Sequence, residues 1–405
     1  MELLLVFAAT LVLGVLASGT AQRSILSTAV LFLAAGFVAG PAAVDAVHLD
    51  PRDPIVITLS TLALYSILFT DGMHAGAGDL RSAWRLPGRA LLFGMPLTFA
   101  GTAVFARYLA GLDWNESMLV GAVLAPTDPV FAAALVGRKE VPWRLRHLLN
   151  VESGLNDGLA LPVVLILLSV VSTNRHTSTL EVLGELALGV IVGIVVPLVM
   201  LRIEALAFFR AAERYQPLNA FAIGILVLAI CEQTQANAFL AAFAAGSTVA
   251  SVSPAARASF ERFGELVSEL FKLAAILVFG ALLTTSLFTV DPFVSWGFAL
   301  LLLFVVRPVS IGISLYGGGL ERREFAAAAW FGPKGFASVT YGLLVLQSNA
   351  VHATRMFELI AMAIAVSIVL HSSTDVPIAK WFLPGDAAPV PQGGPARSRP
   401  PSPEA

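Results

Sequence analysis

NVESGLNDGLALPVVLILLSVV, residues 150–171, is apolar enough to cross a lipid bilayer, yet it carries a carboxylate at Asp157. Upstream, a second apolar stretch is interrupted at residues 125–130 by APTDPV, where two prolines flank a Thr-Asp pair. A carboxylate at membrane depth costs roughly 2.5–3.5 kcal/mol on insertion scales, and it usually marks an ion or proton path. A span that breaks its own helix supplies loose carbonyls and half-helix ends for binding ions. The two stretches together predict a transporter of cations and protons.

The composition is that of an integral membrane protein. The chain has 405 residues, of which 57% are hydrophobic and 13% charged, whereas soluble domains are about 25% charged. The net charge is −2 and no basic run is present, so no nucleic-acid partner is expected. Cys231 is the single cysteine, which excludes an internal disulfide. Glu2 stands where a signal peptide would be positive, so the first apolar stretch is predicted to be a retained span.

Hydropathy divides the chain into thirteen candidate spans, at about 20 apolar residues for each crossing. Loop charges support that count: with the N-terminus outside, 18 of the 25 Lys and Arg fall in cytoplasmic segments and 4 in external ones. The expected fold is therefore an all-α membrane domain over residues 1–383, followed by a disordered, proline-rich cytoplasmic tail over 384–405. The predicted spans are 2–18, 25–40, 54–72, 87–110, 116–136, 149–173, 180–203, 217–231, 235–252, 264–289, 294–315, 323–347 and 355–382.

Thirteen spans form two sets of six, inverted relative to each other and joined by the seventh. In each set the fifth span carries a break, at residues 126–129 in one and 332–335 in the other. Proline is common in membrane helices for structural reasons. Paired breaks at corresponding positions are nevertheless the best sequence indication of a transporter's binding site, and each of these breaks holds one charged residue.

Helical periodicity separates the polar residues around Asp157 onto two faces. Successive helix residues turn by about 100°, so Ser153 shares a face with Asp157, while Glu152 shares another with Asn156. We expect the first face to meet the ion and the second to meet another helix. A buried Glu152 then needs a positive partner, for which Arg307 is the candidate, although such a pair can also be no more than a packing clamp.

Oxygen atoms are the ligands that alkali cations prefer. The carboxylate of Asp157, the hydroxyl of Ser153 and the freed carbonyl of Thr127 form such a set. Desolvation favours the protonated form of a carboxylate, so Asp157 can take up a proton near neutral pH and release it to a cation. The alternative is a structural acid satisfied by its helix neighbours.

The charged residues of the two breaks have a simpler electrostatic interpretation. Negative charges are favoured at helix N-termini and positive charges at C-termini, so we expect Asp128 to meet converging N-termini and Lys334 the opposite ends. Lys334 can alternatively gate the substrate. Asp71, within LFTDGMH (68–74), is either an accessory residue for ion entry or an acid at a loop edge.

Two further pairs have helical spacing. Glu269 and Lys272 are three apart and predict a pair on one helix, while His371 and Asp375 are either a pH sensor or hydrogen-bonded packing. The sequence has no His, Cys and carboxylate cluster with metal-ligand spacing and no phosphate-binding glycine loop. No cofactor is expected, and an enzyme is disfavoured because no metal or nucleophile constellation is present.

These motifs resemble those of the NhaP-type bacterial sodium/proton antiporters, which belong to the sodium/proton exchanger family. APTDPVFAAALVGR (125–138) and NVESGLNDG (150–158) carry the resemblance, and FVVRPVSI (304–311) and FGPKGFASVTYGLLVL (331–346) are similar to the two later motifs. The resemblance covers residues 1–382. It implies a thirteen-helix homodimer in the bacterial cytoplasmic membrane, in which a six-helix core moves against a dimerisation scaffold.

By matching position, the resemblance implies that Asp157 carries the ion and the proton, with Ser153 and Thr127 as ligands. It implies that Asn156 marks electroneutral exchange and that Glu152 and Arg307 form the family's ion pair. The implied function is exchange of one Na⁺, or Li⁺, for one H⁺. K⁺/H⁺ exchange is the alternative, and a passive cation channel is more remote.

Two positions depart from the family's pattern. The usual acid directly after Phe69 is replaced by Thr70, with the acid displaced to Asp71. Lys334 stands where arginine is usual, which keeps the charge but loses the forked donor geometry.

Overall fold

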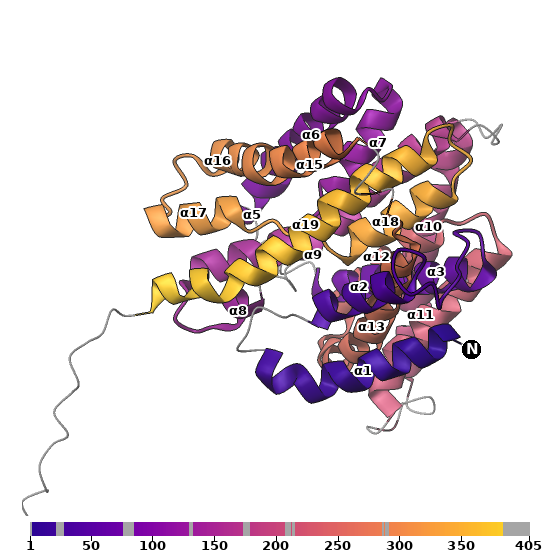
Figure 1. The fold of residues 1–405 in the computed structure, drawn as a ribbon. Coiled ribbons are helices and arrows are strands. Elements are labelled where there is room, and N and C mark those ends of the chain that lie inside the picture. Colours follow the sequence, from indigo (N-terminus) through magenta and orange to yellow (C-terminus); the bar gives the residue numbers. More distant parts are fainter. Residues whose placement is uncertain are drawn as a thin grey trace, which may run out of the picture.

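A computed structural model describes residues 2–21, 28–75, 85–128, 133–172, 179–206, 212, 215–285, 287 and 291–383 of the chain. Every regular element in these residues is a helix (Figure 1). Seven of these helices are long and apolar enough to cross a membrane alone, and one pair bent by 119° raises the number to eight. Shorter or broken helices fill the remaining predicted ranges.

The first half of the described chain runs to the end of the helix that carries Asp157. It comprises α1 (Glu2–Ala21), α2 (Thr28–Ala39), α3 (Pro54–His74), α5 (Leu86–Arg89), the π-helical turn η1 (Ala90–Gly94), α6 (Met95–Ala110), α7 (Trp114–Leu124), α8 (Ala133–Gly137) and α9 (Trp143–Val171). A long and largely unburied helix, α10 (Thr179–Glu204), follows.

The second half repeats this order. It comprises α11 (Gln216–Gln233), α12 (Ala238–Val252), α13 (Pro254–Leu282), α15 (Pro292–Leu301), the π-helical turn η4 (Leu302–Val306), α16 (Arg307–Leu315), α17 (Arg322–Trp330), α18 (Phe336–Gln347), α19 (Ala353–Ala379) and the short η5 (Lys380–Phe382). In both halves an interrupted fourth span precedes a broken fifth span and a long sixth, as the two predicted sets of six require.

The paired π-helical turns were not predicted from the sequence. Each turn widens its helix, and a proline stands two residues after the end of the turn: Pro96 after η1 and Pro308 after η4. Proline removes a backbone donor from the helix, and a π turn absorbs such a local disruption. The two interrupted helices pack against each other, α16 on η1 and α6 on η4. Arg307 begins the helix after the second turn.

Small residues let several helices approach closely. A Cβ atom at Gly72 of α3 would meet the backbone of α12, and one at Gly246 of α12 would meet the backbone of α3. Gly36 of α2 and Gly280 of α13 form an equivalent pair. Close packing at small residues is a main source of helix association in membranes, and here it fixes α3 and α13 beside the interior.

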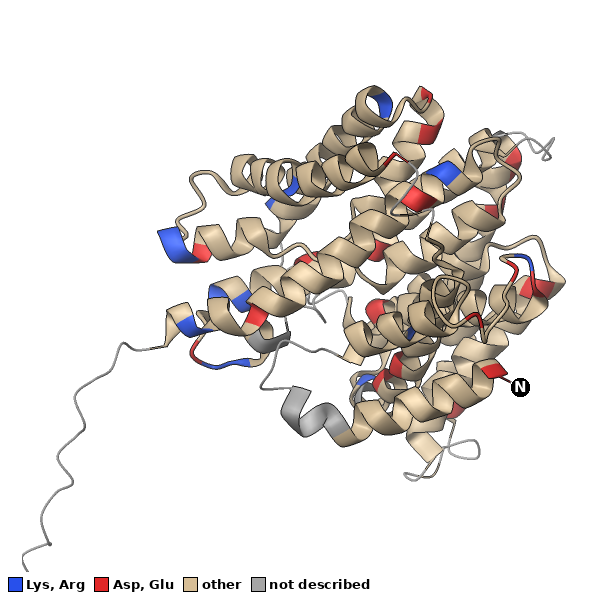
Figure 2. Cartoon of the chain, in the orientation of Figure 1, with Lys and Arg blue, Asp and Glu red and all other residues tan. Residues whose placement is uncertain are grey.

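Two predicted helix starts were wrong, because polar first turns extend beyond the apolar stretches. α13 begins at Pro254 instead of residue 264, where Ser253 caps it by accepting from the Ala256 amide at 3.2 Å. α9 begins at Trp143 instead of residue 149. Lys and Arg segments gather at the end of the bundle where α17 begins and α19 ends (Figure 2). The predicted tail, 384–405, lies outside the described residues.

Candidate functional site

Asp128 of the first break lies at the N-terminus of α18, just after the second break. Its carboxylate Oδ2 accepts from the Phe336 amide at 3.2 Å, and its own amide donates to the Pro333 carbonyl at 2.9 Å. A carboxylate in this position balances the exposed amides and the positive end of the helix. The first break therefore stabilises the half-helix that follows the second.

Lys334 of the second break makes the reciprocal contact. Its fully buried ammonium donates to the Pro126 carbonyl at 3.3 Å, just beyond the C-terminus of α7. Its backbone amide donates to Ser367 Oγ on α19 at 2.8 Å. Each break thus places its charged residue on the half-helix end of the other break, which is the arrangement expected from helix-end electrostatics.

The two glycines of the GPKG segment are required by the charged residues beside them. A Cβ atom on Gly335 would overlap the side chain of Asp128, and one on Gly332 would overlap the guanidinium of Arg307. Bare backbone is therefore needed on both sides of Lys334. This close approach accounts for a motif that proline alone does not explain.

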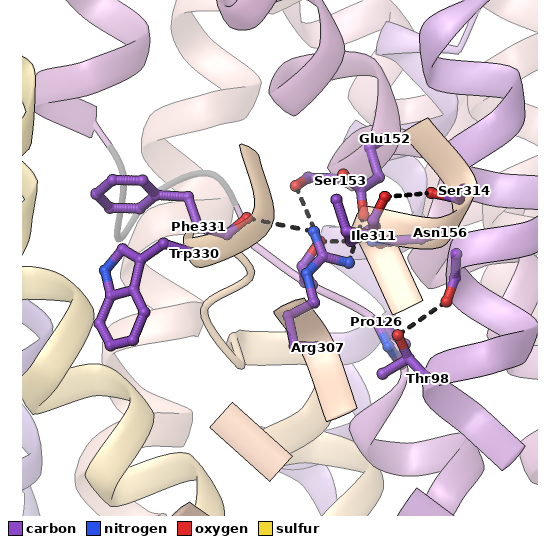
Figure 3. Close-up of polar contacts among 12 residues, drawn as sticks. Thr98, Pro126, Glu152, Ser153, Asn156, Arg307, Ile311, Ser314, Trp330 and Phe331 are labelled. Carbon is purple, nitrogen blue, oxygen red and sulfur yellow. Dashed lines mark hydrogen bonds and ion pairs between the residues drawn. The ribbon is translucent and has the colours of Figure 1, made fainter. Parts of the chain in front are cut away.

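Glu152 and Arg307 form a buried ion pair that joins α9 to α16 (Figure 3). Arg307 Nη1 donates to Glu152 Oε1 at 2.7 Å, and Nη2 donates to the Phe331 carbonyl at 3.2 Å. Both side chains are at most 3% exposed. The arginine thus ties the helix that carries Asp157 to the start of the second break, and it is the partner that was the candidate for Glu152.

Asp157 lines a cavity of about 540 Å³ together with Ser153, Asp128 and Asp71. Asp157 itself is 5% exposed, and the hydrogen bonds among described residues include none to its carboxylate, although its backbone carbonyl accepts from Tyr341 at 3.0 Å. Oδ2 of Asp71 is also buried without a hydrogen-bond partner. Two carboxylates from different helices therefore face one polar cavity.

Thr127, Ser153 and Asn156 form a small hydrogen-bonded cluster behind the cavity wall. Thr127 Oγ1 lies 3.2 Å from Ser153 Oγ and accepts from Asn156 Nδ2 at 2.8 Å. Of the three, only Ser153 lines the cavity. The Thr127 hydroxyl is therefore engaged by both neighbours, and Asn156 holds it in place by donating to it.

The cavity extends from Asp157 to an exposed rim formed by side chains of α3 and α13. His74 at the end of α3 and Glu265 of α13 line this rim, with their side chains 42% and 55% exposed and 3.3 Å apart. Asp71, about one turn before His74 on α3, lines the same cavity. The carboxylate of Asp157 is thus buried but connected to one side of the molecule.

The two pairs predicted from helical spacing have different contacts. Glu269 and Lys272 form no ion pair within 4.0 Å, so the predicted helix couple is wrong; Lys272 instead lies over the Phe336 ring. His371 contacts the Ser367 and Trp330 carbonyls, at 2.8 and 3.1 Å. Asp375 accepts from the Leu135 amide of α8 at 2.9 Å. Neither His371 nor Asp375 is among the residues that line the cavity.

A family model described as "Sodium/hydrogen exchanger, transmembrane" matches residues 7–381. The chain belongs to the sodium/hydrogen exchanger family. Membership places it among the monovalent cation/proton antiporters, which are multi-pass membrane transporters and not enzymes. The fold agrees with that of the sodium proton antiporter MjNhaP1 from Methanocaldococcus jannaschii, with a TM-score of 0.76 over 94% of this chain and 99% of that one, at 18% identity.

The chain also resembles two curated proteins that are longer than it is. The chain is 23% identical over 357 residues to the K(+)/H(+) antiporter NhaP of Alkalimonas amylolytica, covering 87% of this chain and 62% of that protein. It is 25% identical over 393 residues to the K(+)/H(+) antiporter NhaP2 of Shewanella baltica, covering 94% and 67%. The chain therefore spans about two thirds of the length of these relatives.

Proposed function

We propose that this protein exchanges a monovalent alkali cation for a proton, and that both bind in turn to the carboxylate of Asp157. The observation that carries the proposal is a buried carboxylate that lines a cavity and has no hydrogen-bond partner among the described residues. A buried charge without a partner is unfavourable. Asp157 therefore gains from binding either a proton or a metal cation.

The proposed ligand set consists of oxygen atoms, which suit a hard cation. It comprises the Asp157 carboxylate, the Ser153 hydroxyl and the Thr127 carbonyl, with water completing the shell. Asp71 is the accessory carboxylate, because its unpartnered Oδ2 borders the same cavity. Asn156 supports the set by donating to Thr127.

Competition for one carboxylate produces antiport without further machinery. A cation displaces the proton on one side of the membrane, and a proton displaces the cation on the other, while alternating access moves the loaded site. One proton then leaves for each monovalent cation that arrives, so exchange is electroneutral. The cavity reaches one end of the bundle through His74 and Glu265, which we assign to the cytoplasmic side from the loop charges.

Sodium, with lithium as a close substitute, is the proposed cation. Potassium is the second candidate, and the specific observation in its favour is that two similar proteins are named K(+)/H(+) antiporters. We further propose a homodimer in a bacterial cytoplasmic membrane, with the N-terminus outside and the C-terminus in the cytoplasm.

The test uses purified protein in liposomes that enclose a pH-sensitive dye and carry an imposed proton gradient. Adding Na⁺ or Li⁺ is expected to dissipate the gradient, and a series of Li⁺, Na⁺, K⁺ and Rb⁺ ranks the cations. Asp157→Asn is expected to abolish the signal while the protein remains folded, judged by its elution from a sizing column. Full activity in Asp157→Asn would remove the assigned carrier, and clamping the membrane potential with valinomycin should leave the wild-type rate unchanged.

A further inference from the structure

Lys272 brings a positive charge into the cavity that the proposed function assigns to a transported cation. It lies on α13, and its side chain lines the cavity with Asp157 and Asp71. The ammonium lies 5.3 Å from the centroid of the Phe336 ring, which is a favourable position for a cation over an aromatic face. Among the described residues it makes no ion pair within 4.0 Å.

The surroundings of Lys272 are acidic on every side. Four carboxylates interact electrostatically with its ammonium, and they come from three helices and from the first break. The ionisable groups that line the cavity with it are Asp71 and His74 of α3, Asp128 of the break, His147 and Asp157 of α9, and Glu265 and Glu269 of α13. Lys272 is the only lysine or arginine among these lining residues.

The Phe336 ring, over which the ammonium lies, belongs to the place where the two breaks contact each other. Phe336 is the first residue of α18, and its amide donates to Asp128. The position of Lys272 is therefore fixed by the same element that holds Asp128. A cation held in this place is a permanent feature of the cavity, not a side chain that swings in from solvent.

A fixed cation weakens the binding of any other cation nearby. Na⁺ and H⁺ carry the same charge and compete for the same Asp157 carboxylate in the proposed function, so the repulsion from Lys272 acts on both. A unit charge several ångströms away in a protein interior changes cation binding by about tenfold. The ratio of the two affinities remains almost unchanged, while both absolute affinities fall.

We propose that Lys272 is an affinity-setting residue, a built-in cation that weakens Na⁺ and H⁺ binding at Asp157 by a common factor. The inference rests on the proposed function. It explains how a site lined by five carboxylates releases its cargo: without the lysine, the acidic cavity would hold both ions more tightly than turnover allows.

The proposal gives a distinctive pH profile for the half-saturating cation concentration, KM. At alkaline pH no proton competes, so neutralising Lys272 lowers KM by the full factor. At acidic pH the gain in cation affinity is cancelled by an equal gain in proton affinity, so KM is unchanged. The pH at which KM starts to rise therefore shifts upward.

The experiment measures KM for Na⁺ in dye-loaded proteoliposomes between pH 6 and pH 9.5. Lys272→Met and Lys272→Gln are expected to lower KM by about tenfold at the alkaline end and to leave it within twofold at the acidic end. Lys272→Arg is expected to keep the wild-type profile. The matched control is Lys380→Met, because Lys380 is exposed at the end of the last helix and is not among the residues that line this cavity.

Three results would overturn the proposal. One is an unchanged KM profile in both neutral variants, and another is a parallel shift at all pH values. The third is loss of folded protein in both neutral variants while Lys272→Arg folds, which would assign the charge a structural role. Failure of the proposed function is distinguishable, because wild-type protein would then show no cation-driven proton movement at all.

Discussion

Replacing Arg307 with methionine removes the positive partner of Glu152 and leaves a carboxylate in a site that is at most 3% exposed. The carboxylate can escape the penalty by taking up a proton. For a carboxyl group with an ordinary pKa of about 4.3, that step costs about 1.36 kcal/mol for each pH unit above the pKa. The cost is therefore about 5 kcal/mol at pH 8 and about 1 kcal/mol at pH 5, in the range seen when buried ion pairs are broken.

The destabilisation of Arg307→Met should thus be about 4 kcal/mol smaller at pH 5 than at pH 8. The lost hydrogen bond to the Phe331 carbonyl adds about 1 kcal/mol that does not depend on pH. The double variant Glu152→Gln/Arg307→Met contains no stranded charge, so it should recover most of the stability at pH 8. Its remaining loss should be the same at both pH values.

Thermal unfolding of detergent-solubilised protein, followed by sizing chromatography after heating, measures this series at pH 5 and pH 8. Arg323→Met is the matched control, because this exposed arginine also donates to a backbone carbonyl, that of Trp381, and makes no buried ion pair. Equal losses at both pH values for Arg307→Met, or no recovery in the double variant, would refute the view that a compensated charge holds α9 to α16.

Two further predictions concern the crossing of the breaks and the competition at the cavity. Gly335→Ala should destabilise the protein by about 1–3 kcal/mol, because its Cβ overlaps the Asp128 side chain. Gly184→Ala in α10, with open space around it, should not destabilise the protein. Equal melting temperatures for the two variants would contradict the packing argument. In wild-type proteoliposomes, KM for Na⁺ should rise about tenfold for each unit fall in pH at the acidic end, because one proton competes at Asp157. A hundredfold rise for each pH unit would indicate two competing protons and would rule out a single carrier carboxylate.

Much of the fold was predictable, because apolar length and loop charge report directly on membrane crossing. The two faces of α9 were also predictable, since helical periodicity alone separates Ser153 and Asp157 from Glu152. The π-helical turns were not, because local sequence marks them only by a following proline, which most membrane helices accommodate in other ways. The hydrogen bond between the Thr127 hydroxyl and Asn156 was not predictable from the sequence either, because it depends on where Asn156 lies in the folded protein.

Lys272 shows the same limit more sharply. Its spacing from Glu269 favours a pair on one helix, but α13 runs beside α3 and α18, so aromatic and acidic groups from other elements surround the ammonium. Local spacing offers Glu269 as one neighbour, whereas tertiary packing adds four further groups, three carboxylates and the Phe336 ring. Short-range charge patterns therefore predict poorly in an interior where several helices present polar residues to one cavity.

The buried charges of this protein divide into two kinds by their contacts. Lys334 and Arg307 donate to fixed carbonyls and to Glu152, while Asp128 caps α18; these charges hold half-helices and cannot exchange partners without loosening the crossing. Asp157 lacks such a contact at its carboxylate, and it lines an open cavity together with Ser153 and Asp71. Because a buried carboxylate needs a counter-charge, and Lys272 in the same cavity forms no ion pair with Asp157 within 4.0 Å, we infer that the counter-charge at Asp157 is mobile. An antiporter needs an exchangeable counter-charge at one position only. The surrounding charge pairs keep the Asp157 side chain in place while the ion bound to it changes.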